Sequence, residues 1–135
     1  MLIDPPYEDS AGDLDGALRA ALAALARLSH AVIALWYPIK DERELSPWFA
    51  RAAALLSAPA PNNPTPTHPT LNSQLWLYPR DSRVALNGSG LLIVNPPYQF
   101  DEGLQRWLPQ VCAVLAAAAG ASSSAGTALD WLVPA

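Results

Sequence analysis

The first residues in this chain that could do chemistry are Asp4, Pro5, Pro6 and Tyr7, which follow directly on the apolar start Met1–Ile3. The two prolines fix two φ angles and remove two backbone N–H donors, so carbonyl oxygens are left as acceptors. The Asp4 carboxylate and the Pro5 carbonyl could both accept hydrogen bonds from one exocyclic –NH2 group, while the Tyr7 ring stacks on the base that carries it. The pattern predicts a turn that presents an amine for methylation. The alternative is a strand-ending turn in which Asp4 caps and the prolines stop the strand.

A second copy of the pattern occurs at residues 95–98, Asn-Pro-Pro-Tyr. Asp and Asn both serve at the first position of amine-methylating turns, so the chemistry alone does not choose between the copies. In a doubly wound sheet, ligands bind at the carboxyl ends of the parallel strands. We expect Asn95 to follow an antiparallel strand and to emerge at the opposite edge. We therefore assign the catalytic turn to Asp4 and interpret residues 95–98 as a strand terminator with a packed aromatic.

Trp36, Tyr37 and Lys40 end the next expected strand, on the same edge as Tyr7. They are tentative substrate-binding residues: the two rings could line a base pocket, and Lys40 could lie near a phosphate. A core aromatic pair before a proline turn explains Trp36 and Tyr37 equally well.

Further motifs stand in a fixed order along the chain. Residues 2–8 read Leu-Ile-Asp-Pro-Pro-Tyr-Glu, residues 34–40 read Ala-Leu-Trp-Tyr-Pro-Ile-Lys, residues 88–98 run from Gly-Ser-Gly to Asn-Pro-Pro-Tyr, and residues 130–134 read Asp-Trp-Leu-Val-Pro. In this order and spacing the chain resembles the bacterial 23S rRNA adenine-N6-methyltransferase family, large-subunit methyltransferase J. The resemblance covers nearly all of the chain but only the C-terminal half of the family.

The resemblance implies an α/β fold, the C-terminal part of a Rossmann-like methyltransferase sheet with parallel strands, a terminal antiparallel hairpin and flanking helices. It implies S-adenosylmethionine as the donor, the N6 amino group of one adenine in 23S rRNA as the acceptor, and a cytoplasmic location. Asp4, Pro5, Pro6 and Tyr7 then take the catalytic positions.

The family's donor site is a glycine-rich turn upstream of the Asp-Pro-Pro-Tyr strand. Gly88-Ser89-Gly90 precedes a strand instead of opening a helix, which is the wrong side for such a cradle. We therefore expect residues 1–135 to form a single incomplete domain that looks N-terminally truncated and lacks the donor-binding half. The alternative is an inactive remnant or a partner-binding fragment, with self-association through an exposed sheet edge.

Composition narrows the classes of partner. The formal net charge is −4 with a pI near 4.9, so most phosphate contacts to RNA would have to come from the missing half. A single cysteine, Cys112, excludes an internal disulfide. The sequence predicts no leader, no membrane-spanning run and no metal site, since His30 and His68 lack ligand spacing.

Periodicity predicts the remaining elements. A buried strand stub over residues 1–3 precedes a helix with a leucine stripe from Leu14 to Leu28 and an N-cap at Asp13. A strand buried on both faces is expected at 31–36. A helix is expected at 47–57, burying Phe49 and Leu56, and it could begin near Glu42 with a kink at Pro47. A Pro-rich loop follows at 58–70, and hairpin strands at 75–78 and 91–94 close the sheet edge.

The last helix is expected to be capped by Asp101 and kinked or split by Pro109. Its buried face would carry Leu104, Leu108, Val111 and Leu115. An apolar tail at 129–133, strand or docked loop, ends the chain.

Overall fold

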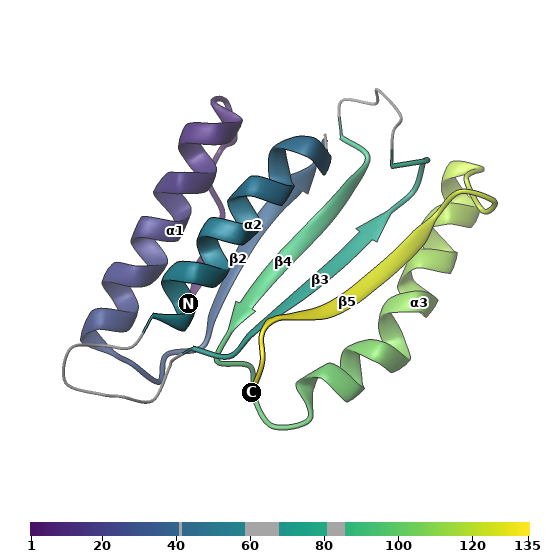
Figure 1. Ribbon diagram of the computed structural model, residues 1–135. Helices are drawn as coiled ribbons and strands as arrows, with labels where there is room; N and C mark the ends of the chain where they lie inside the picture. Colours follow the sequence, from purple (N-terminus) through teal and green to yellow (C-terminus); the bar gives the residue numbers. More distant parts are fainter. Residues whose placement is uncertain (41, 59–67, 81–85) are drawn as a thin grey trace.

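The structure is a computed structural model that describes residues 1–40, 42–58, 68–80 and 86–135. Five strands and three helices follow one another along the described residues (Figure 1). In chain order they are β1 Leu2–Ile3, α1 Ser10–Arg27, β2 Ile33–Ile39, α2 Glu42–Ser57, β3 Thr70–Trp76, β4 Gly88–Val94, α3 Phe100–Ala119 and β5 Gly126–Val133.

All five strands form one mixed sheet in the order β1-β2-β4-β3-β5. β1 is parallel to β2, whereas β4 is antiparallel to both β2 and β3, and β5 is antiparallel to β3. The predicted α/β class and the antiparallel hairpin are confirmed, since β3 and β4 pair from Thr70 with Val94 to Trp76 with Gly88.

The prediction that this hairpin closes the sheet edge is wrong. β4 lies inside the sheet between β2 and β3, and β5 forms the edge beyond β3. The tail expected at residues 129–133 is thus a complete strand, which pairs along β3 from Gly126 opposite Trp76 to Val133 opposite Thr70. Pairing between segments this distant in the chain leaves no local pattern in the sequence.

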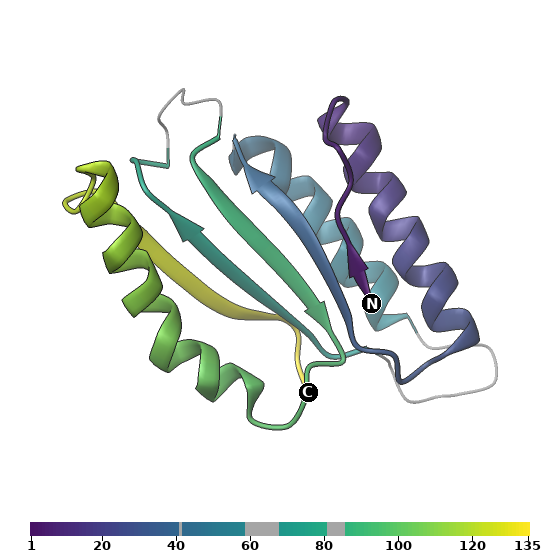
Figure 2. The same cartoon turned by 180° about the vertical axis from the view of Figure 1, so that it is seen from behind.

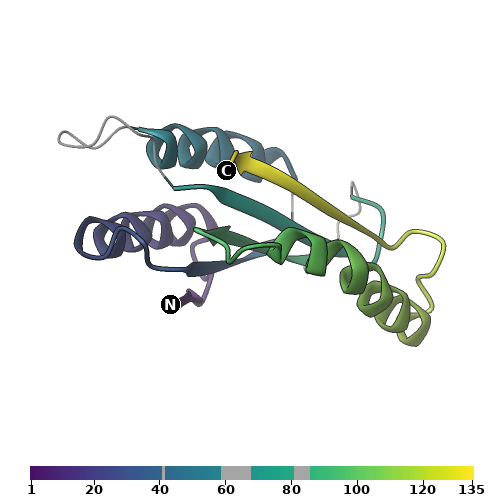
Figure 3. The same ribbon diagram turned by 90° about the horizontal axis from the view of Figure 1, so that it is seen from below.

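The helices cover the sheet unequally. Helices α1 and α2 lie side by side on one face, while α3 lies on the other face along β5 (Figures 2 and 3). Alternate residues of β2 follow this division: Ile33, Leu35 and Tyr37 are buried against α1 and α2, whereas Ala34 and Trp36 on the other face are only half-buried. β2 is therefore not buried on both faces as predicted.

At the β1 end of the sheet, burial differs from the prediction. β1 is parallel as predicted, but it is not buried, because Leu2 is 67% exposed. β1 is an edge strand whose only partner within the described residues is β2, which confirms the expected exposed edge.

Helix α1 begins one turn earlier than predicted. Asp9, not Asp13, is the N-cap residue, and Asp13 lies in the first turn. The Asp13 carboxylate accepts a hydrogen bond from the Asp9 backbone N–H at 3.1 Å. Asp13 therefore does satisfy a backbone donor at the helix start, but it reaches back from inside the helix, as an acidic side chain in the first turn can.

Helix α2 follows the longer of the two predicted alternatives. It begins at Glu42 and includes Pro47. Its buried face carries Leu56 as expected, while Phe49 is half-buried and Trp48 is the largest fully buried side chain. Most of the Pro-rich stretch predicted at 58–70 lies outside the described residues.

Helix α3 is one helix that includes Pro109, so the predicted split is wrong. Asp101 is not its cap: the N-cap is Gln99, and Asp101 and Glu102 occupy the first turn, where negative charge complements the helix dipole. The predicted apolar face is right in part: Leu104 and Leu108 are buried, together with Cys112 and Ala116, whereas Val111 and Leu115 are exposed.

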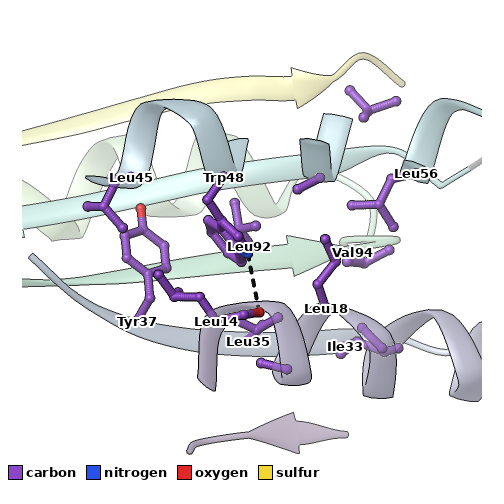
Figure 4. Close-up of a cluster of buried hydrophobic side chains, with 14 of the residues drawn as sticks. Leu14, Leu18, Ile33, Leu35, Tyr37, Leu45, Trp48, Leu56, Leu92 and Val94 are labelled. Atoms are coloured by element: carbon purple, nitrogen blue, oxygen red, sulfur yellow. Dashed lines mark hydrogen bonds between the residues drawn. The ribbon is translucent and has the colours of Figure 1, made fainter. Parts of the chain in front are cut away.

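The main core lies between the sheet and helices α1 and α2 (Figure 4). Trp48 of α2 fills its centre and donates a hydrogen bond from its indole N–H to the Leu14 carbonyl of α1 at 3.2 Å. This bond satisfies the one polar group of the largest core side chain and ties the two helices together. A smaller core of Leu71, Ile93 and Leu104 lies under α3.

Candidate acceptor-amine site

The Asp4–Tyr7 turn leaves β1 at the carboxyl end of this strand, three residues before the carboxyl end of β2. Ile3 is level with Leu35, so Asp4 follows beside Trp36. Asp4 is exposed and Pro5 is half-buried, whereas Tyr7 is 6% exposed. The carboxylate thus lies on the surface at the strand ends, where ligands collect in sheets of this type.

The Tyr7 side chain anchors the turn to β2. Its hydroxyl donates a hydrogen bond to the Trp36 backbone carbonyl, and its ring packs edge-on against the Trp36 ring with the centroids 5.3 Å apart. Tyr7 itself has φ +53°, in the left-handed region that non-glycine residues rarely adopt. Burial raises the pKa of Tyr7 above its ordinary value, and the negative charges of Asp4 and Asp13 raise it further. The hydroxyl therefore stays protonated and remains a donor at neutral pH.

An open cleft of about 480 Å³ lies between the turn and helix α1. Ile3, Asp4 and Pro5 form one wall, and the first turns of α1 form the other. The α1 wall was missed by sequence reasoning, which assigned no functional role to the helix after the turn. The signal available was the four-residue spacing of Gly12, Gly16 and Ala20, which puts small residues on one flank of the helix.

The other predicted binding residues are not gathered at this cleft. Trp36 is half-buried at the turn, and its indole N–H donates to the Ser89 hydroxyl. Tyr37 points to the opposite face and is fully buried, which favours the alternative of a core aromatic. Lys40 is exposed at the far end of β2, four residues or roughly 13 Å beyond the level of Asp4's neighbour Trp36.

Tyr37 has a structural environment of its own. Its hydroxyl donates to the Asn72 side-chain oxygen at 2.6 Å and accepts from the Gln74 side-chain nitrogen at 3.0 Å. Burial raises the pKa of Tyr37 most strongly, and the charge of Asp130 raises it further, while the hydrogen bonds with Gln74 and Asn72 and the charge of Arg80 lower it. Its ring packs against Trp48 and Phe49. These contacts fix Tyr37 between α2 and the sheet.

The Asn95 turn emerges at the opposite edge, as predicted. Val94 is level with Ile33 at the start of β2, so the turn lies far from the carboxyl end of β1. The Asn95 side-chain nitrogen donates to the Ser29 and Ala31 carbonyls, each at 3.0 Å. Asn95 therefore fastens the end of β4 to the α1–β2 loop. The expected packed aromatic is wrong, because Tyr98 is 92% exposed.

The glycines at 88 and 90 belong to strand β4 and form no ligand cradle. A Cβ on Gly90 would lie 2.0 Å from the Tyr37 ring, so an aromatic side chain already occupies the space beside this backbone. A Cβ on Gly88 would lie 2.2 Å from the Leu75 carbonyl. Both glycines are required by close packing inside the protein.

Among the described residues, no group of three His, Cys, Asp or Glu side chains could hold a metal ion. In the same part of the chain, each helix is too short or too polar to cross a bilayer. Cys112 is a buried core residue, as predicted, with its thiol near the carbonyls of Trp76 and Gly126.

Comparison with known proteins connects this arrangement to a family. The family model described as ribosomal RNA large subunit methyltransferase D, RlmJ, matches residues 1–133. The chain belongs to the RlmJ family. The match includes the Asp4 turn, the β2 strand and the β4 strand, the segments whose motifs carried the resemblance.

Two curated RlmJ relatives are each 24% identical over 134 residues, the ribosomal RNA large subunit methyltransferase J of Escherichia coli (strain K12) and that of Haemophilus influenzae. The matched region covers 99% of this chain but 42% of each relative. The chain therefore spans less than half the length of the curated RlmJ proteins that it matches.

A solved structure confirms the fold. Protein LPL1258 from Legionella pneumophila superposes with a TM-score of 0.74 at 20% sequence identity, covering 96% of this chain and 42% of that one. The chain of LPL1258 thus also extends well beyond the part that superposes on this protein.

Proposed function

We propose that this chain carries the acceptor-amine turn of a 23S rRNA adenine-N6-methyltransferase, in which Asp4 and the Pro5 carbonyl orient the N6 amino group of one adenine. The observation that supports this most directly is the position of Asp4. Its side chain is exposed on an open cleft at the carboxyl end of a parallel strand, in a chain that matches the RlmJ family over residues 1–133.

The role of each residue follows from its chemistry. The Asp4 carboxylate and the Pro5 carbonyl have no protons to donate, so together they accept both protons of one –NH2 group and direct its lone pair outward. Pro5 and Pro6 restrict the turn that holds these acceptors. S-adenosylmethionine would supply the methyl group. Holding the amine in line with that group is the contribution of this chain, because orientation accounts for much of the rate in such transfers.

Tyr7 has two roles in the proposal. Its hydroxyl anchors the turn to the Trp36 carbonyl, and its ring covers the adenine once the base has left its stack. In the present structure the Tyr7 ring is buried against Trp36. To cover the base, either the exposed edge of the ring contacts it or the turn changes its conformation. Trp36 is the second aromatic at the turn.

In this proposal the donor is held outside the described residues. The glycines that most resemble a cradle, Gly88 and Gly90, are filled by packing. Donor binding is therefore assigned to the part of an RlmJ-length protein that lies outside the matched region, and we expect the 135-residue chain alone to be inactive. The exposed β1 edge also supports the second candidate function, a fragment that acts by binding a partner.

The test is Asp4→Ala in an RlmJ-length protein that contains this chain. We expect methyl transfer to an rRNA fragment to fall by about 10²–10³-fold, the scale seen when one positioning hydrogen-bond group is removed, while donor binding measured by calorimetry changes little. Asp4→Asn keeps an acceptor oxygen and should retain more activity than Asp4→Ala. Equal losses of transfer and donor binding would show that Asp4 is structural.

A further inference from the structure

Strand β5 forms the edge of the sheet on the side away from β1 (Figure 1). Within the described residues its only sheet partner is β3, so the backbone groups on its outer side have no strand beside them. The pairing with β3 is regular from Gly126 to Trp131 and shifts only beyond Trp131. Edge strands are commonly protected by prolines, bulges or charges. Residues 126–131 contain no proline and one charged side chain, Asp130, so the β5 edge can accept a further strand.

A partly exposed tryptophan lies on this edge strand. Trp131 is opposite Leu71 and two residues after Leu129, and both of these leucines pack in the smaller core under α3. Because side chains alternate along a strand, the Trp131 ring lies on the α3 face of the sheet. Trp131 is 37% exposed. A large aromatic group is therefore open to solvent beside the outer edge of β5.

A cavity of about 290 Å³ lies on the same face, between α3 and the start of β5. Cys112, Ala113 and Ala116 form its helix side, and Gly126 and Thr127 belong to its strand side. The described residues that line it all have small side chains, and none of them is charged. A cavity of about 150 Å³ already admits a benzene ring. This cavity therefore has room for the two rings of an indole.

Antiparallel pairing of β5 with a second copy of itself brings the tryptophan and the cavity together. Directly opposite side chains share a face in such a pair, so the two-fold axis passes through a residue. The registers that pair most of β5 put this axis at Leu129 or at Asp130. With the axis at Leu129, Trp131 of each copy is opposite Thr127 of the other, with their Cβ atoms about 4.5–5.5 Å apart. The Trp131 ring then stands at the cavity of the other copy.

The charge on β5 favours the same register. With the axis at Asp130, the two Asp130 carboxylates would be directly opposite each other, where like charges are destabilising. With the axis at Leu129, each Asp130 is opposite Ala128 of the other copy. Electrostatics and the position of the cavity thus select one pairing independently.

We propose that β5 pairs in this register with a second copy of the chain, and that Trp131 of each copy fills the cavity of the other. The two halves of this interface are identical, as a two-fold dimer requires. One chain supplies the strand, the aromatic group and the cavity that accepts it. The acceptor-amine cleft lies across the sheet beside β1, so it stays open in both copies, and the inference does not depend on the proposed function.

The experiment measures self-association of the 135-residue chain by sedimentation equilibrium. Because the interface consists of one strand pair and two indole rings, it is small, and we expect a reversible equilibrium of monomer and dimer. As the dimer forms, hydrogen exchange should slow in residues 126–131 and stay unchanged at Leu2 and Ile3 on the other edge. Trp131→Ala should raise the dimer dissociation constant by about 30-fold or more, the scale of a buried tryptophan at the centre of an interface.

Ala113→Leu tests the cavity without changing β5. Ala113 is an exposed residue of the cavity wall, so the larger side chain should exclude the ring of the other copy and raise the dissociation constant by about tenfold or more. Ala118→Leu and Trp107→Ala are the matched controls, because both residues are exposed on α3 outside the cavity, and neither should change the dissociation constant.

Three outcomes would each overturn the proposal. The first is a chain that stays monomeric at every concentration. The second is a dimer that the two controls weaken as much as Trp131→Ala and Ala113→Leu do, because its interface would then lie elsewhere. The third is slower exchange at Leu2 and Ile3 with no change in residues 126–131.

Discussion

Gly90 tests whether the Gly88-Ser89-Gly90 run is packing or a ligand site. A methyl group on Gly90 would lie 2.0 Å from Cζ, 2.3 Å from Cε2 and 2.4 Å from the hydroxyl oxygen of Tyr37. Favourable carbon contacts are at about 3.5–4.0 Å, so Gly90→Ala forces the ring or the strand to move by more than about 1 Å. Tyr37 has no room to move, since it is fully buried and hydrogen-bonded to Asn72 and Gln74.

The size of the effect follows from these contacts. Overpacking a well-packed core costs about 1–3 kcal/mol, and displacing the hydroxyl from a buried partner costs about 1 kcal/mol more. We expect Gly90→Ala to lower the free energy of unfolding by about 2–4 kcal/mol. The assay is urea unfolding followed by tryptophan fluorescence, in which this loss lowers the midpoint by about 1–2 M.

Two further variants make the result decisive. Gly103 lies in α3, and a Cβ there meets nothing within 4 Å, so Gly103→Ala should stabilise the protein by about 0.5–1 kcal/mol. In a Tyr37→Ala background the clash is gone, and Gly90→Ala should have a much smaller effect. The reasoning is refuted if Gly90→Ala changes stability by less than about 0.5 kcal/mol, or if its effect is the same with and without the Tyr37 ring.

Two other predictions concern the buried tyrosines. Tyr7→Phe keeps the ring but removes the hydrogen bond to the Trp36 carbonyl. Urea unfolding should therefore show that the free energy of unfolding falls by about 0.5–1.5 kcal/mol. An unchanged unfolding midpoint would mean that the hydroxyl does not anchor the turn. Burial raises the pKa of Tyr7 and Tyr37 above the ordinary 10.0, so above about pH 10 the unfolded chain loses protons that the folded chain keeps, and stability falls as pH rises. Urea unfolding midpoints measured between about pH 8 and pH 11 test this pH dependence. In the Tyr37→Phe variant the midpoint should fall less steeply with pH. A midpoint that stays constant over this range in the unmodified protein would contradict the prediction.

Local patterns in the sequence determined the helices and the candidate turn. Leucine periodicity placed most of the buried face of α1 and half of that of α3, although Leu28, Val111 and Leu115 of the predicted stripes are exposed. The run Asp4 to Tyr7 marked a strand end with acceptor groups. These features depend on neighbours within a few residues, so the chain displays them directly. The N-cap was missed by about a turn in α1, where it is Asp9, and by two residues in α3, where it is Gln99. Asp13 and Asp101 instead stabilise the first turn from inside it.

Only the tertiary structure decided which strand lies inside the sheet and which residues line the cleft. The insertion of β4 between β2 and β3, and the pairing of β5 outside β3, join segments tens of residues apart. The same is true of the Tyr37 ring over Gly90 and of the α1 wall of the cleft beside Asp4. Tyr37 and Trp36 are adjacent in the sequence, yet strand alternation sends one into the core and the other to the turn. The residue types thus indicated the kind of chemistry. The strand register and the packing of helices on the sheet decided which side chains can take part in it.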